Sequence, residues 1–143
     1  MDCDDPRAEF ERRFAELVRR PRGGRWEPNA DVVMDEEART LVVRVELAAA
    51  DSESLRVFVD EQELFISGRR LPGARLRAGS FLQKEIADGE FIKKLRLPVS
   101  VHQGEVTATY ADGMLTIALP IAAGEYLPAS RTEIRMIVKR ILA

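Results

Sequence analysis

The sequence predicts an all-β fold, either a sandwich or a barrel. From Trp26 onward, short segments alternate between apolar and polar residues, and turn-forming residues separate them roughly every 8–12 positions. No helical segment of crossover length lies between these segments, so a parallel sheet of strand–helix–strand units is not expected. The dipeptide Asp112-Gly113, which lies between two alternating segments, adds a tight-turn signal typical of antiparallel hairpins.

Length and composition indicate one domain without a general affinity for polyanions. The chain has 143 residues and a net charge of -2, so neither nucleic acid nor a membrane is expected as a partner. No apolar run approaches the roughly 20 residues needed to cross a bilayer. The N-terminus lacks the charged start and apolar centre of a signal peptide, and we therefore expect a cytoplasmic protein.

Residues that carry catalysis or bind metals are scarce. Cys3 is the only cysteine and His102 the only histidine, which excludes a disulfide framework and a cysteine or histidine cluster within one chain. Neither a phosphate-binding GxxxxGK[ST] loop nor a nucleophile-elbow motif is present, and acidic residues fall mainly in turns and on exposed strand faces. We therefore expect no enzyme, no metal site and no cofactor.

The first 25 residues are expected to form an arm outside the β domain. Asp5 can cap an amphipathic helix over residues 1–20, with Pro6 at its first position. The apolar side of this helix consists of Phe10, Phe14, Leu17 and Val18, and the opposite side of Glu9, Arg12, Arg13 and Arg19. So short a helix needs a packing partner, which is either its own domain or dimer, or clients and sister subunits. Residues 19–25, RRPRGGR, have the composition of a flexible basic linker.

Four strands are expected in the first half of the domain. The first covers residues 31–35, and the second covers residues 41–47 with every second side chain apolar. After a loop, Leu55, Val57 and Val59 alternate with Arg56, Phe58 and Asp60. Leu64 and Ile66 then alternate with Phe65 and Ser67. Each strand therefore presents one apolar side to a core.

An irregular stretch, residues 69–80, interrupts the series of strands. Four arginines, a proline and two glycines make it a solvated connection. Expected strands follow at residues 81–86 and 91–97. A hairpin through Asp88-Gly89 would place Lys84 opposite Lys93, a like-charge pair that destabilises antiparallel strands. The two segments are therefore not expected to pair with each other.

The last two strands, residues 106–110 and 114–119, have the best-specified register. A two-residue turn at Asp112-Gly113 places Val106 opposite Leu119, Ala108 opposite Ile117 and Tyr110 opposite Leu115. Thr109 and Thr116 then share the polar face. Pro120 ends the second strand because it has no N–H to donate.

This hairpin also carries a family resemblance. The stretch from Ala108 to Leu115 matches the A-x-x-x-x-G-x-L signature of the small heat shock proteins, the Hsp20 or α-crystallin family. Trp26-x-Pro28 before Asp31-Val32, residues 64–70 and residues 89–98 resemble further motifs of that family in the same order. The resemblance covers residues 26–121 and is of the bacterial type.

Three positions depart from the family pattern. Leu47-Ala48-Ala49 stands where Leu-Pro-Gly is usual, Ile86 replaces an arginine, and Gln62 replaces an asparagine in the turn before Leu64. These departures affect local turns and dimer-interface ion pairs rather than the fold.

The resemblance implies an immunoglobulin-like β-sandwich of seven or eight strands and three parts: an arm at 1–25, an α-crystallin-like domain at 26–121 and a C-terminal extension at 122–143. It implies an ATP-independent holdase that binds partly unfolded client proteins. An alternative from another class is a scaffold that uses the sandwich to bind one specific partner. The resemblance also implies a homodimer, and a higher homo-oligomer is compatible with it. The strand exchanged with the partner's first strand would consist of Phe81, Leu82, Gln83, Lys84, Glu85 and Ile86.

The resemblance further implies a groove at the edge of the sandwich, into which a neighbour's C-terminal tail docks through an I-x-I motif. The groove would be lined by Leu55, Val57, Val59, Val106, Ala108 and Tyr110. Ile134 and Met136 are the nearest match to the motif, and methionine is a suitable filler because it is flexible. The tail also fits a helix, since residues 130–133 form a capping box and apolar residues follow at helical spacing. The sequence leaves both tail structures open.

Overall fold

The computed structural model describes residue 12 and residues 26–60, 62–71, 79–122 and 132–139. The predicted arm residues Phe10, Phe14, Leu17 and Val18 lie outside this part of the chain. Arg12, on the predicted polar side of the arm, is helical and exposed.

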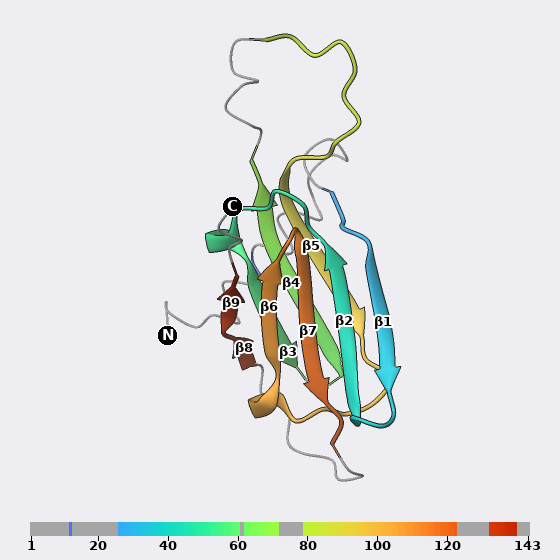
Figure 1. Ribbon diagram of the computed structural model, residues 1–143. Coiled ribbons are helices and arrows are strands. Elements are labelled where there is room, and N and C mark those ends of the chain that lie inside the picture. Colours follow the sequence, from blue (N-terminus) through green and yellow to red (C-terminus); the bar gives the residue numbers. More distant parts are fainter. Residues whose placement is uncertain (1–11, 13–25, 61, 72–78, 123–131, 140–143) are drawn as a thin grey trace, which may run out of the picture.

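Two sheets pack face to face, as the sequence predicts (Figure 1). One sheet has the order β1-β2-β7-β6-β9 and the other the order β5-β4-β3-β8. The strands of the first sheet are β1 (Ala30–Asp35), β2 (Thr40–Glu46), β7 (Met114–Pro120), β6 (Thr107–Ala111) and β9 (Met136–Val138). Those of the second sheet are β5 (Gly89–Arg96), β4 (Glu63–Arg70), β3 (Arg56–Asp60) and β8 (Thr132–Ile134). All neighbouring strands are antiparallel except β6 and β9, which are parallel.

The core lies between the sheets and follows the predicted alternation. Leu41, Val43, Val45 and Leu47 are fully buried, while Arg44 and Glu46 are exposed. On the facing sheet, Val57, Val59, Leu64 and Ile66 are also fully buried. The two-residue period of a strand therefore places the apolar set of each strand in one shared core.

The β6–β7 hairpin has the predicted register. Ala108 pairs with Ile117, Thr109 with Thr116 and Tyr110 with Leu115. Both turn residues adopt positive φ, 54° at Asp112 and 75° at Gly113, as a type I′ turn requires. A Cβ at Gly113 would lie only 3.0 Å from Cα of Ala48, and the Gly113 carbonyl accepts a 2.8 Å hydrogen bond from the Leu47 N–H. The signature glycine is therefore required by both conformation and space.

The strand expected at residues 81–86 is absent, and this prediction is wrong for the single chain. These residues lie in the connection that extends beyond one end of the sandwich (Figure 1). β5 pairs with β4 along its whole length, so Lys84 and Lys93 are not opposed. β4 also continues through Arg70, so the irregular connection begins two residues later than expected.

Candidate functional site

The six residues of the predicted groove are buried along one side of the sandwich. Leu55, Val57 and Val59 come from β3 and the residue before it, and Val106, Ala108 and Tyr110 from β6 and the residue before it. All six belong to the main core cluster, with exposed fractions of 9% or less. β3 and β6 would each be the last strand of their sheet if β8 and β9 were removed.

The C-terminal segment of the same chain occupies this groove. In β8, Ile134 pairs with Val57, and in β9, Met136 pairs with Ala108. Ile134 is 5% exposed, and Met136 packs against the core cluster. The strand alternative for the tail is therefore confirmed for residues 132–138, and the helix alternative is wrong there. In this structure the tail comes from the same chain and not from the expected neighbour.

Besides its strand pairing, the tail makes few polar contacts with the rest of the described chain. The Lys139 N–H donates a 2.9 Å hydrogen bond to the carbonyl of Tyr110. Arg56 Nε lies 3.6 Å from Glu133 Oε1, with both side chains nearly half exposed. An exposed pair of this kind contributes about 1 kcal/mol at most. The tail therefore depends mainly on the side chains of Ile134 and Met136 and on short stretches of backbone pairing.

Two further apolar segments lie in water. Among the described strands, β1 pairs with β2 alone, and its residues Val32, Val33 and Met34 are 43%, 51% and 43% exposed. In the 81–86 segment, Phe81 is 55% exposed and Leu82 is fully exposed. An apolar edge strand with open backbone groups is a template for pairing with another chain.

A cation–π contact anchors the base of the long connection. The Arg70 guanidinium carbon lies 4.0 Å from the centroid of the Trp26 ring. Arg70 also donates hydrogen bonds to the carbonyls of Ala48 (2.9 Å) and Ala87 (2.7 Å), and Trp26 Nε1 donates to the carbonyl of Gly89 (3.0 Å). Sequence reasoning missed this contact because residues 44 positions apart carry no local signal of proximity.

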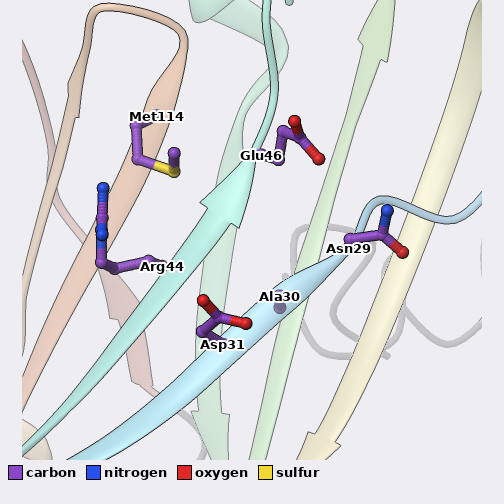
Figure 2. A pocket seen from close by; sticks show the side chains of 6 residues that line it. All are labelled: Asn29, Ala30, Asp31, Arg44, Glu46 and Met114. Carbon is purple, nitrogen blue, oxygen red and sulfur yellow. The ribbon is translucent and has the colours of Figure 1, made fainter.

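A hollow of about 240 Å³ lies near the β1 edge of the first sheet, the edge opposite the groove. It is formed by Asn29, Ala30, Asp31, Arg44, Glu46 and Met114, from β1 and the residue before it, β2 and β7 (Figure 2). Arg44 lies opposite Asp31 in the ladder, so both signs of charge line the hollow. It is open to solvent, and it adjoins β1, the edge strand of this sheet.

In the described ranges, no group of three or more His, Cys, Asp or Glu side chains could hold a metal ion. His102 lies before a short 3₁₀ turn, Gln103–Glu105, and its backbone N–H donates to the carbonyl of Pro120. No helix in the described part of the chain is long and apolar enough to cross a membrane.

Comparison with known proteins agrees with this architecture. The model of the Hsp20/alpha crystallin family matches residues 33–135, which include both walls of the groove and the motif residue Ile134. The chain belongs to this family. In the Hsp20 chain, the matched region ends one residue before Met136, so it includes β1 from residue 33, β2–β7 and all of β8, and β9 lies outside it.

Relatives of this Hsp20 chain occur in plants and bacteria. It is 30% identical over 95 residues to the 18.1 kDa class I heat shock protein of Arabidopsis thaliana, covering 66% of this chain and 59% of that protein. It is 29% identical over 123 residues to the 18 kDa heat shock protein of Streptomyces albus, covering 82% of both. The chain spans less than two thirds of the length of the plant relative and of small heat shock protein C4 of Rickettsia felis, of which it covers 56%.

Solved structures share the fold. Heat shock protein 16.0 from Schizosaccharomyces pombe superposes with a TM-score of 0.64 at 22% identity, covering 85% of this chain and 92% of that chain. HspA from Xanthomonas axonopodis superposes with a TM-score of 0.59 at 26% identity, covering 67% of this chain and 94% of that chain.

Proposed function

We propose that this Hsp20 chain is an ATP-independent holdase, which binds partly unfolded proteins and prevents their aggregation. The observation that carries the proposal is the groove between β3 and β6, whose six side chains belong to the core and whose outer strand edges pair, within the described residues, with the chain's own tail. Among the described residues, that tail is held by short strand pairing, the packing of Ile134 and Met136, a backbone hydrogen bond from Lys139 and one exposed ion pair. Because these contacts are few, heating should detach the tail well before the sandwich unfolds.

The detached state suits clients of a particular kind. An unfolding protein offers extended segments with apolar side chains at alternate positions, which is the pattern that Ile134 and Met136 present to the groove. Backbone pairing with β3 or β6 is independent of the client's sequence, so binding is unselective. No nucleotide takes part, and no catalysis is proposed.

We also propose that two chains form a dimer by exchanging residues 81–86. The segment has six residues, and so has β1, whose open edge would receive it from the partner chain. Pairing would cover Val32, Val33 and Met34 and would give Phe81, Leu82 and Ile86 an apolar surface. Association of the full sandwich would then remove the exposed apolar edge that makes β1 a hazard for aggregation.

A light-scattering assay tests the holdase proposal. The full chain is mixed with a heat-labile model substrate without ATP, and the expected result is concentration-dependent suppression of substrate aggregation. No suppression at stoichiometric excess would contradict the proposal. Affinity capture from heated extract distinguishes the holdase from the alternative, a scaffold that binds one specific partner. Capture of many unrelated heat-labile proteins would indicate a holdase, and capture of one stable partner at all temperatures would indicate a scaffold.

A further inference from the structure

Two phenylalanines are buried on the outer face of the second sheet, which would be exposed to solvent in a two-layer sandwich. Phe58 lies between Val57 and Val59, which face the core, so its side chain points to the opposite side of β3. Phe65 likewise lies between the fully buried Leu64 and Ile66 in β4. Phe58 and Phe65 pair directly across the two strands and form a second cluster, separate from the main core.

Both rings are nearly inaccessible. Phe58 is 5% exposed and Phe65 is 6% exposed, although the first sheet packs on the other side of β3 and β4. Two rings side by side on an open sheet face cannot shield each other to this extent, since each keeps its outer surface. Lys94 lies over Phe65, with Nζ 5.7 Å from the ring centroid, but one half-exposed lysine does not cover two rings. A third layer therefore lies over this pair.

The chain enters the fold at the edge of the sheet that carries this pair. Trp26 bridges to Phe91 in β5, the strand next to β4, and its ring lies 5.1 Å from the Phe91 ring. The 25 residues before Trp26 are thus joined to the domain at the edge of the sheet that carries Phe58 and Phe65. Their sequence predicts an amphipathic helix, and Arg12 on its polar side is helical and exposed. In the predicted helix, Phe10 and Phe14 lie on the side opposite Arg12.

We propose that the arm of the same chain covers the Phe58–Phe65 pair, with Phe10 and Phe14 packed on the two rings. The arm is thereby an integral third layer, and lifting it bares an aromatic surface separate from the groove.

Photo-crosslinking in the full chain tests the arrangement. p-Benzoylphenylalanine replaces Phe14 in one variant and Arg19, on the polar side, in a matched control. The expected result is that the Phe14 position crosslinks to peptides containing Phe58 or Phe65 and the Arg19 position does not. Crosslinks of Phe14 to other regions only would overturn the proposal. In a mixture of light and heavy-isotope chains, links between unlike chains would overturn it as well, because they would assign the cover to a second copy.

Hydroxyl-radical footprinting supplies a second readout that does not depend on the crosslinker. In the variant F10S/F14S, oxidation of Phe58 and Phe65 should rise several-fold over the parent chain, and in R19S it should stay unchanged. The variant Y126S/L127S tests residues 123–131, the nearest competing cover. If Y126S/L127S exposes the pair and F10S/F14S does not, the arm is not the cover and the proposal fails.

Discussion

The hydroxyl of Tyr110 donates a 2.6 Å hydrogen bond to the carbonyl oxygen of Leu47, 63 residues earlier in the chain. The same hydroxyl accepts a 3.2 Å hydrogen bond from the N–H of Ala50. Tyr110 thus joins the wall of the groove to the turn after β2, and its ring is 9% exposed. Position 110 is both a groove residue and a structural tie.

Removing this hydroxyl should destabilise the fold. Tyr110→Phe keeps the ring in the groove but removes the stronger donor to the Leu47 carbonyl and one acceptor of the Ala50 N–H, so that these two groups keep only the 3.2 Å hydrogen bond between them. We expect the free energy of unfolding to fall by about 0.5–1.5 kcal/mol, measured by urea denaturation of the full chain. An unchanged denaturation midpoint would mean that water replaces the hydroxyl at no cost.

Gly68 should not tolerate a side chain. A Cβ at this position would lie 2.8 Å from Leu55 Cδ2 and 2.8 Å from Phe91 Cζ, so Gly68→Ala overpacks the core by about 1–3 kcal/mol. Gly104→Ala is the matched control, since no atom lies within 4 Å of a Cβ there. Equal thermal unfolding temperatures for the two variants would contradict this expectation.

Ala49 is one of the departures from the family pattern, at the place where glycine is usual, and it adopts φ 59°. The left-handed region costs a residue with a Cβ about 1–2 kcal/mol, which exceeds the entropic cost of glycine. Ala49→Gly should therefore raise the free energy of unfolding by about 0.5–1 kcal/mol. Ala48→Gly, at a neighbour without positive φ, should lower it. Urea denaturation measures both variants. A lower denaturation midpoint for Ala49→Gly than for Ala48→Gly would exclude strain at Ala49.

The exchanged strand can be tested with proline. Leu82→Pro removes a backbone N–H from residues 81–86 and fixes φ, so pairing with the partner's β1 should fail. We expect light scattering to give the mass of a dimer or multiple dimers for the parent chain and of a monomer for Leu82→Pro. Gly79→Pro, in the same connection but before the segment, should keep the parent mass. A dimer of Leu82→Pro would exclude the exchange.

The tail contact can be tested with a buried charge. Ile134→Asp places a carboxylate opposite Val57, where its burial without a partner is unfavourable, so the tail should detach. Hydrogen exchange should quicken in β3 and β6, and suppression of aggregation should begin at a lower temperature. Ile137→Asp is the control because Ile137 is 47% exposed on the same segment. Similar exchange in both variants would show that Ile134 does not hold the tail.

Much of the fold follows from the sequence because alternation, turn residues and proline are local signals. The register of β6 and β7 follows from Asp112-Gly113 alone, and the buried sides of β2, β3 and β4 follow from their two-residue period. The groove residues were found through the family resemblance, and the structure brings all six together.

Local patterns failed in two situations. One is a contact between residues far apart in the sequence, and the other is a segment whose pattern fits a helix and a strand equally well. The tail satisfies helical spacing and strand spacing alike, and only its pairing with β3 and β6 decides for strands. The burial of Phe58 and Phe65 was also missed, because alternation assigns them to the outer side. Two phenylalanines directly opposite on a nominally polar face were the available signal of a further layer.

The tail connects two sheets with one residue, Arg135, between β8 and β9. If either β8 or β9 detaches, the pairing of the other strand is weakened as well. The two edges of the sandwich should therefore open as one cooperative unit and not one after the other. The same event frees a segment that carries its own strand pattern and can join the open edge of another chain. Detachment of the tail would thus expose the groove and free the tail to bind another chain in the same transition. A rise in temperature should therefore increase the capacity to bind client proteins and change the size of the assembly together.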